Sequence, residues 1–393
     1  MDNLSNLKII YPYPMKLSYG YSYMLSILQF LNALSELFEV EILSLDSTEE
    51  LERYFKDILG IKKNKFLSVR TISNKFLGIK SNKLFFFRNA KKYIKKNLKT
   101  NNIIFYSRDF KQIKLSYKAF KNYPNVKFIF EVHQILSENY KRRGDLKNST
   151  KMKELESYVF KNVDILISIT KTLQSDIRKN FYLEKPKLVI LPVGFNKDYL
   201  SARESKKDID IIYTGNFSEW KGLDILIEAI SIYKIQYSRK IHVKLIGARP
   251  NDMNKYKAMI NKFDVDDYVE IIPRVSHKEI LSYLSRSVIG VLPNKFLDDG
   301  IFYTSPLKLY EYLGVGLKVI VSRLPSIQSN IDESLVYFFE PENPDDLALK
   351  IHNAILDSNF EKSKVQNFAS NYTWEERAEK FRNFIYENIN YKI

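Results

Sequence analysis

The chain alternates short apolar runs with longer segments of helical period, and this alternation limits the fold more than any other feature. Residues 7–11 and 209–214 are rich in β-branched side chains, whereas residues 24–38 carry apolar side chains at helical spacing. A parallel sheet wrapped by helices produces this pattern. Because the pattern occurs in each half of the chain, we expect an α/β protein with two doubly wound, Rossmann-like domains.

The predicted elements follow from this pattern. In the first half we predict strands at residues 7–11, 39–45, 103–106, 127–131, 164–167 and 188–191, with helices that include 24–38 and 84–98. In the second half we predict strands at 209–214, 242–246, 269–272, 288–292, 318–321 and 335–339, and helices at 222–233, 252–262, 277–284, 306–313 and 344–357. The polar residues 201–208 have the composition of a linker. We therefore expect one domain over residues 1–200 and another over residues 208–371.

Composition excludes several classes of protein. A chain of 393 residues is long enough for two domains, each with its own core. It has no cysteine, which excludes disulfides and thiolate metal sites, and only four histidines. We expect no signal peptide, and we find no apolar run of the roughly 18 residues that a spanning helix needs. We expect a cytoplasmic protein without a bound metal or cofactor.

The net charge of +16 is concentrated in the first half of the chain. Residues 51–150 hold 25 basic and 6 acidic side chains, with aromatic residues between the lysines. Anionic lipid headgroups or a phosphorylated acceptor would be attracted to such a surface. Nucleic acid would be attracted too, and a lysine-rich genome composition is a further explanation. Our interpretation is that residues 51–150 meet an anionic membrane surface, at the inner face of the cell membrane, and that nucleic acid is not a partner.

Residues 302–322 contain the strongest local motif, a helix with a marked start followed by an apolar strand. Ser305 is a good N-cap and Pro306 is favoured at the first helical position, while Gly314 and Gly316 are expected to end the helix. The free N–H groups at such a helix start bind anions, and Lys308 adds a positive charge. Glu311 lies three residues later on the same face, where its carboxylate can accept from two vicinal hydroxyls. The motif predicts that this helix binds a nucleoside diphosphate. An ordinary amphipathic helix with solvated charges would have the same sequence pattern.

Several loops that leave predicted strands also carry candidate ligands, because ligands of doubly wound sheets lie beyond the carboxyl ends of the strands. Gly215 permits close approach of the backbone and Lys221 can neutralise a phosphate. Other candidates leave neighbouring strands in each half: Gly20, His133, Gly247 and Arg274. Turn chemistry explains the glycines nearly as well, and a lone histidine is more often structural.

Taken together, these motifs resemble the retaining glycosyltransferases of the GT-B fold, family 4. The resemblance rests on residues 213–216, 220–229, 291–293, 305–313, 319–322 and 324–325, with weaker matches at 131–133, 191–194 and 372–375. It implies a nucleotide-sugar donor in the C-terminal domain, a glycan or polyprenyl-linked acceptor in the N-terminal domain, and a last helix, about residues 372–393, that packs back on the first domain.

The resemblance also implies roles for single residues. Lys221 would bind the donor diphosphate, Glu311 the ribose, and His133 would lie near the donor sugar and the acceptor; these three are the candidate catalytic residues. The implied donor-binding set is Gly20, Gly215, Asn216, Lys221, Gly247, Arg274, Tyr303, Thr304, Ser305, Pro306, Leu307, Lys308 and Glu311. No catalytic base is implied, because the leaving diphosphate helps to deprotonate the acceptor, and catalysis is charge stabilisation with positioning.

Two positions depart from the family pattern. Asn216 stands where the family usually has an arginine, so that Lys308 is our candidate for the second phosphate cation. Tyr303 stands where the family usually has a first glutamate, and Asp298 or Asp299 are candidates to replace it.

The sequence therefore predicts a hexosyltransferase-type enzyme that acts with retention in bacterial surface polysaccharide biosynthesis. A GT-B nucleotide-sugar epimerase is the alternative enzyme, although it would call for more histidine around the sugar. A basic nucleic-acid-binding protein is the alternative from another class, but it leaves the Lys308–Glu311 helix without a purpose.

Overall fold

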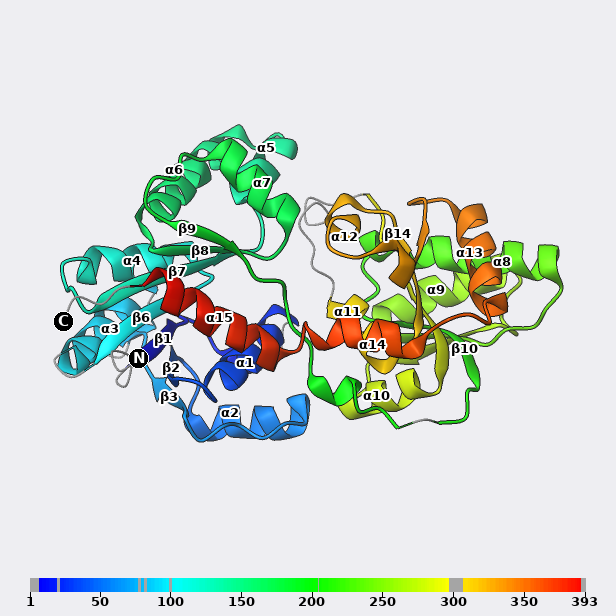
Figure 1. Cartoon of the computed structure of the whole chain (residues 1–393), viewed down its shortest axis with the longest axis horizontal. Coiled ribbons are helices and arrows are strands. Elements are labelled where there is room, and N and C mark those ends of the chain that lie inside the picture. Colours follow the sequence, from blue (N-terminus) through cyan, green and yellow to red (C-terminus); the bar gives the residue numbers. More distant parts are fainter. Residues whose placement is uncertain are drawn as a thin grey trace. The chain divides into compact units, whose positions relative to one another are not determined.

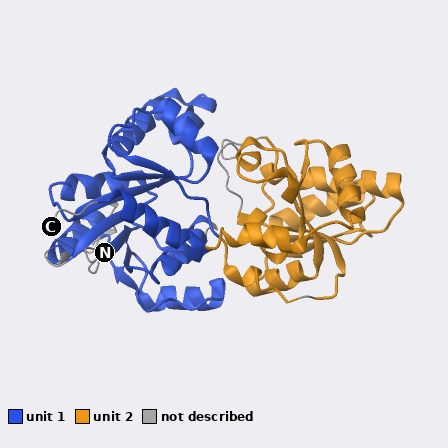
Figure 2. Ribbon diagram, viewed as in Figure 1, with its two compact units in different colours: residues 1–194, 374–393 blue, residues 195–373 orange. Residues whose placement is uncertain are grey.

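A computed structural model describes residues 7–19, 22–76, 79–80, 83–98, 101–203, 205–296 and 307–389 of the chain. The chain divides into two compact units (Figure 2). Unit 1 consists of residues 1–194 and 374–393, and unit 2 of residues 195–373.

Unit 1 is built on a seven-stranded parallel sheet (Figure 1). The strand order is β3-β2-β1-β6-β7-β8-β9. The strands are β1 (Leu7–Pro12), β2 (Glu39–Ser44), β3 (Leu67–Thr71), β6 (Asn102–Ser107), β7 (Val126–Val132), β8 (Ile165–Ser168) and β9 (Lys187–Ile190). Every residue of the central strand β1 is buried, whereas the edge strand β3 is mostly exposed. Burial on both faces is why the central strands read as continuous apolar runs.

Helices connect these strands in unit 1. They are α1 (Ser22–Leu34), α2 (Thr48–Tyr54), α3 (Lys83–Asn97), α4 (Phe110–Phe120), α5 (Leu136–Arg142), α6 (Leu146–Asn162), α7 (Lys171–Asn180) and α15 (Trp374–Asn388). Short elements are a 3₁₀ turn η1 (Leu17–Tyr19), a π-helical turn η2 (Phe55–Leu59) and a strand pair β4 (Lys75–Phe76) and β5 (Ile79–Lys80). The Asp109 carboxylate caps α4 by accepting from the N–H groups of Lys111 and Gln112, which sets the chain direction after β6.

The C-terminal helix α15 belongs to unit 1, although unit 2 separates it from the rest of that unit in sequence. It packs beside α1, as Figure 1 shows. The Trp374 indole N–H donates to Gln29 Oε1 at 2.7 Å, and the rings of Phe30 and Phe381 meet edge to face at 5.6 Å. Burial of these aromatic side chains anchors the helix by the hydrophobic effect.

Unit 2 repeats the architecture with a six-stranded parallel sheet in the order β12-β11-β10-β13-β14-β15. The strands are β10 (Ile209–Thr214), β11 (Val243–Ala248), β12 (Val269–Pro273), β13 (Ser287–Leu292), β14 (Lys318–Ser322) and β15 (Tyr337–Phe339). The order of strands reverses between β10 and β13, and doubly wound sheets bind ligands at such a switch point.

The helices of unit 2 are α8 (Leu223–Tyr237), α9 (Pro250–Lys262), α10 (His277–Ser285), α11 (Leu307–Val315), α12 (Pro325–Gln328), α13 (Pro344–Leu356) and α14 (Lys362–Ser370). The described residues of this unit also form the short 3₁₀ turns η3 (Lys197–Tyr199), η4 (Glu219–Lys221) and η6 (Glu333–Leu335). A core of buried side chains from β10, β11, β13, α8 and α13 holds the sheet and helices together.

The predicted fold class is confirmed, with two parallel-sheet, Rossmann-like domains. Three details differ from the prediction. Helix α11 runs through Gly314 and ends at Val315, directly before the other predicted terminator, Gly316, whose φ is +85°. The last strand begins only at Tyr337, after a 3₁₀ turn. Residues 201–208 fall within unit 2, since Lys207 Nζ donates to the carbonyls of Ser285 and Ser287, each at 2.8 Å. No helix among the described residues is both long and apolar enough to span a bilayer.

Candidate functional site

Two loops of unit 2 meet at the switch point of its sheet. One follows β10 and the other follows β13, and the Lys295 N–H donates to the Trp220 carbonyl at 2.8 Å. Gly222 makes this meeting possible, because its φ is +67° and a Cβ there would lie 1.8 Å from the Pro293 carbonyl oxygen. The sequence thus holds Lys221 in a fixed turn at the carboxyl edge of the sheet.

Gly215 and Gly247 bring the ends of β10 and β11 into contact. The Gly215 N–H donates to the Ile246 carbonyl at 2.9 Å, and a Cβ on Gly247, whose φ is +115°, would lie 2.1 Å from the Gly215 carbonyl oxygen. Asn216 is exposed in this turn, and its carbonyl accepts from the Tyr213 hydroxyl at 2.7 Å. Close packing of backbone on backbone explains both glycines, whatever else the turn binds.

Lys221 is the most perturbed cation in the described part of unit 2. Burial of the amine, and to a lesser degree the charge of Lys308, lowers its pKa from 10.5 to about 7. Its Nζ lies 3.7 Å from the ring centroid of Trp220. A desolvated lysine held against an aromatic face and beside a second cation is a strong site for an anion, because bound negative charge relieves both penalties.

Helix α11 brings Lys308 and Glu311 to the same edge. Lys308 Nζ forms an ion pair with Glu311 Oε2 at 2.7 Å, and the Glu311 side chain is 8% exposed. The helix is held against β10 by Tyr312, whose hydroxyl oxygen accepts from the Thr214 N–H at 2.7 Å. The two side chains predicted to bind the donor are therefore paired with each other.

The predicted helix start lies outside the described residues, as do Tyr303, Thr304, Ser305, Pro306, Asp298 and Asp299; of that stretch only Leu307 onward is described. Gly20 also lies outside them. Arg274 follows β12 and is exposed. Its role in donor binding stays a prediction.

His277 and Tyr199 are two residues of this site that the sequence analysis did not single out. The Tyr199 hydroxyl lies 3.0 Å from His277 Nε2. Burial lowers the pKa of His277, while the nearby Glu311 raises it and Lys308 lowers it. His277 begins α10 and Tyr199 ends η3, so that no sequence spacing connects them to Glu311. Only the fold brings the three together.

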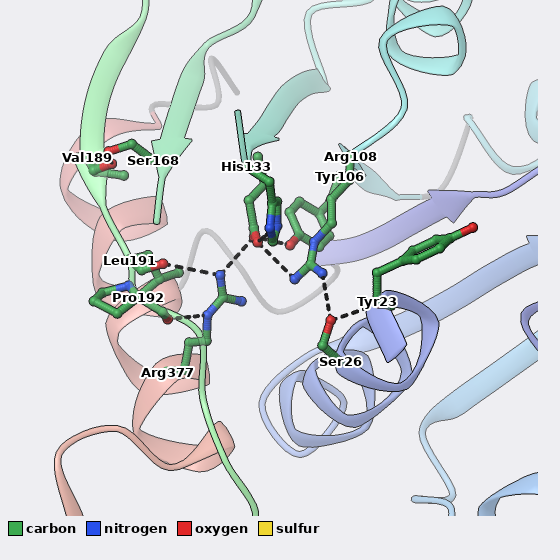
Figure 3. Close-up of polar contacts among 11 residues, drawn as sticks. Tyr23, Ser26, Tyr106, Arg108, His133, Ser168, Val189, Leu191, Pro192 and Arg377 are labelled. Carbon is green, nitrogen blue, oxygen red and sulfur yellow. Dashed lines mark hydrogen bonds and ion pairs between the residues drawn. The ribbon is translucent and has the colours of Figure 1, made fainter. Parts of the chain in front are cut away.

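Unit 1 contains a second polar cluster, centred on the carboxylate of Glu131 in β7 (Figure 3). His133 Nε2 and an Arg108 guanidinium nitrogen each lie 2.8 Å from Glu131 Oε1. Arg377 donates to Oε2 at 2.8 Å, and the Tyr106 hydroxyl donates to the same oxygen. The Glu131 side chain is fully buried, so that these four donors replace its water.

His133 is the member of this cluster that reaches the surface, since 35% of its side chain is exposed. It follows the carboxyl end of β7, as predicted. Burial and the charge of Arg108 lower its pKa, against the raising effect of Glu131. Arg108 and Arg377 were missed by the sequence analysis, because an arginine in a helix or after a strand gives no signal of its partner.

The comparisons with known proteins agree with this architecture. The amylovoran biosynthesis glycosyltransferase AmsK of Erwinia amylovora is 26% identical over 186 residues, which are 47% of this chain and 45% of that protein. The chain thus spans about half the length of the curated relatives it matches.

Solved structures resemble the chain over nearly its whole length. A glycosyltransferase from Rickettsia africae has a TM-score of 0.72 at 19% identity, with 99% of this chain and 100% of that chain covered. Anabaena Alr3699/HepE, solved in complex with UDP-glucose, has a TM-score of 0.69 at 13% identity, with 97% and 99% covered. These likenesses show the fold, which is that of the GT-B glycosyltransferases. Residues 196–371, which make up nearly all of unit 2, match the family model described as glycosyl transferases group 1.

Proposed function

We propose that the chain is a glycosyltransferase that moves a sugar from a nucleoside-diphosphate sugar to a glycan or lipid-linked acceptor in bacterial surface polysaccharide biosynthesis. The observation that carries the proposal is Lys221, a desolvated cation beside Lys308 and Glu311 at the switch point of the second sheet. The family match of residues 196–371, the name of AmsK and the UDP-glucose in a solved structure of the same fold support it.

The Lys308–Glu311 ion pair suggests how a donor would be gripped at both ends. A diphosphate competes with Glu311 for the Lys308 ammonium, since phosphate oxygens are strong acceptors. Glu311, released from that pair, can then accept from the two vicinal hydroxyls of a ribose. Lys221 holds the diphosphate meanwhile and stabilises the charge that develops on it as the glycosidic bond breaks. Binding of the diphosphate thus frees Glu311 to bind the ribose.

The reaction proceeds with retention in this proposal, in keeping with the family 4 resemblance of the sequence. His133 contributes a hydrogen-bonding group to the reaction, and the departing diphosphate assists removal of the acceptor's proton. Catalysis then comes from positioning and from stabilisation of the leaving group. Neither a metal nor an organic cofactor takes part.

The test is release of nucleoside diphosphate from a panel of nucleotide sugars, with and without lipid-linked acceptors. Lys221→Ala and Glu311→Gln are expected to lose donor affinity, whereas the matched controls Lys257→Ala on α9 and Glu228→Gln on α8 keep it. Transfer to an acceptor distinguishes a transferase from an epimerase, which returns an isomerised nucleotide sugar. Unchanged donor affinity in both site variants would refute the assignment of Lys221 and Glu311 to the donor site.

We also propose that unit 1 docks on an anionic phospholipid surface. Around the turn η2, a depression of about 550 Å³ is lined by four lysines, among them the exposed Lys56, Lys62 and Lys65. Ile58 and Phe66 are 44% and 53% exposed in the same segment. Lysines near an anionic surface contribute about 1 kcal/mol each, and exposed apolar side chains can enter the headgroup region.

Flotation with liposomes tests this surface. Wild type is expected to float with anionic vesicles at low salt and not with neutral ones, and the triple variant Lys56→Glu, Lys62→Glu and Lys65→Glu is expected to remain behind. A control with three exposed lysines of unit 2 reversed, Lys255→Glu, Lys257→Glu and Lys262→Glu, separates this surface from net charge. Equal flotation of both triple variants would refute the assignment.

A further inference from the structure

Burial lowers the pKa of His133, and the arginines of the Glu131 cluster, which contains more positive than negative charge, lower it further. Glu131 contributes one negative charge, while Arg108 and Arg377 contribute two positive ones. The remaining titratable groups that face the cluster are Tyr106 on β6 and Tyr11 on β1, and burial raises the pKa of both, so that they are neutral.

Two guanidinium groups keep the Glu131 carboxylate ionised despite its burial. Desolvation alone would raise its pKa, but Arg108 and Arg377 outweigh it and hold the pKa well below its usual range. An ionised carboxylate has only acceptors, so each contact with it must come from a donor. His133 therefore donates its Nε2–H to Oε1 across the 2.8 Å contact.

Burial and the surplus positive charge together favour the neutral imidazole. A proton on His133 would bring a second excess charge into the cluster, and both arginines accordingly lower its pKa. A neutral imidazole that carries its proton on Nε2 has a lone pair on Nδ1. The His133 side chain is 35% exposed, and in the proposal below Nδ1 is the atom that accepts a hydrogen bond there.

We propose that Arg377, on the C-terminal helix, is a positioning residue that keeps His133 as a neutral imidazole with Nε2 donating and Nδ1 accepting. The inference rests on the proposed function only for what Nδ1 meets, which is a hydroxyl of the acceptor. Arg377 itself touches no substrate in this scheme. It acts through Glu131, from 246 positions away in the chain.

The contacts of Arg377 explain why an arginine occupies this place. Its Nε donates to the Pro192 carbonyl at 2.7 Å, and the guanidinium lies 4.0 Å from the ring centroid of Phe30. A nitrogen of the same guanidinium donates to Glu131. Figure 3 shows Arg377 hydrogen-bonded to the segment after β9 at Leu191 and Pro192. A lysine could supply the charge but not the planar fork. The last helix thereby carries a residue on which the site in unit 1 depends.

Nitrogen NMR on protein labelled at the imidazole nitrogens tests the proposal without any activity measurement. The chain has only four histidines, and His133→Gln identifies the signal of interest by its disappearance. In wild type we expect a protonated-type shift at Nε2 and a lone-pair-type shift at Nδ1 at neutral pH. A charged His133, or a proton on Nδ1, would overturn the inference.

Variants of Arg377 supply the second arm. Arg377→Met is expected to raise the pKa of His133 toward or above neutral pH, so that Nδ1 becomes protonated and donates. Arg377→Lys is expected to keep the imidazole neutral. Arg382→Met on the same helix, away from Glu131, should leave the signal as in wild type. A folded Arg377→Met protein with an unchanged His133 signal contradicts the proposal. Should that variant not fold, the wild-type spectrum and that of Glu131→Gln, which is expected to lose the fixed proton on Nε2, decide the question.

Activity then separates this inference from the proposed function. If the spectra are as expected and no nucleotide sugar is consumed, the glycosyltransferase proposal fails while the role of Arg377 stands. If transfer is observed with an Nδ1-protonated His133, the role of Arg377 fails alone.

Discussion

Donor binding should depend on pH through Lys221, in a direction that its burial determines. In the free protein its pKa is about 7, so that about half of the molecules carry the charge at about pH 7. The negative charge of a bound diphosphate offsets the effects of burial and of Lys308, and so raises the pKa of Lys221 toward 10.5. Because the pKa is higher in the complex, binding takes up a proton, and affinity is lost as the pH rises above about 7.

The magnitude follows from the two ionisation states. If only the charged amine binds, raising the pH from about 7 to about 8.5 lowers the charged fraction, and with it the donor affinity, about 15-fold. At about pH 7 each binding event should take up about half a proton. Above the free pKa the loss approaches about tenfold for each pH unit.

Isothermal titration calorimetry with a nucleotide sugar provides the assay. Repeating the titration in buffers of different ionisation heat measures the proton uptake, and the pH series measures the affinity. Lys221→Arg is the control, since a guanidinium stays charged throughout and should flatten both. Wild-type affinity that does not change between these pH values, together with no proton uptake, would refute the reasoning from Lys221.

The remaining predictions concern stability. Arg377→Met should lower the free energy of unfolding of unit 1 by about 3–5 kcal/mol, since it leaves a buried carboxylate without one of its cations, whereas Arg382→Met at a half-exposed pair should cost less than about 1 kcal/mol. Denaturant melts of the two variants should differ accordingly, and equal midpoints would contradict the account. Gly222→Ala should cost more than the about 1–2 kcal/mol of a left-handed backbone alone, because its Cβ would meet a carbonyl oxygen at 1.8 Å. A melting temperature equal to that of wild type would show that the turn relaxes. Tyr312→Phe should cost about 1–3 kcal/mol by leaving the buried Thr214 N–H without its acceptor, and wild-type amide exchange at Thr214 in this variant would count against that contact.

Much of the fold could be predicted from the sequence because the buried parallel strands are recognisable as apolar runs. Residues 209–214 were predicted as a strand with the bounds that the structure has, since burial on both faces requires an unbroken apolar run. Strand β3 was missed because it is an edge strand: only Leu67 is buried in it, and the surrounding segment is basic. Its pairing with β2 depends on the sheet already being formed.

The candidate sites could be predicted only where their residues follow one another in sequence. Lys308 and Glu311 share one helical turn, and their proximity was predicted from that spacing. The ion pair between the two side chains was not predicted, because each was expected to contact the nucleotide sugar and not the other. Glu131 with Arg377, and Glu311 with His277, are joined by folding alone. Neither hydrophobic periodicity nor a capping motif in the sequence indicates such a contact.

The proposed donor site is defined by where the diphosphate of a nucleotide sugar binds. The crystal structure of the chain with a bound nucleoside-diphosphate sugar measures this directly. We predict phosphate oxygens within hydrogen-bond distance of Lys221 Nζ, and the ribose hydroxyls on a Glu311 carboxylate that has left Lys308. A donor bound elsewhere in unit 2, or with the Lys308–Glu311 pair intact and Lys221 turned away, would contradict it.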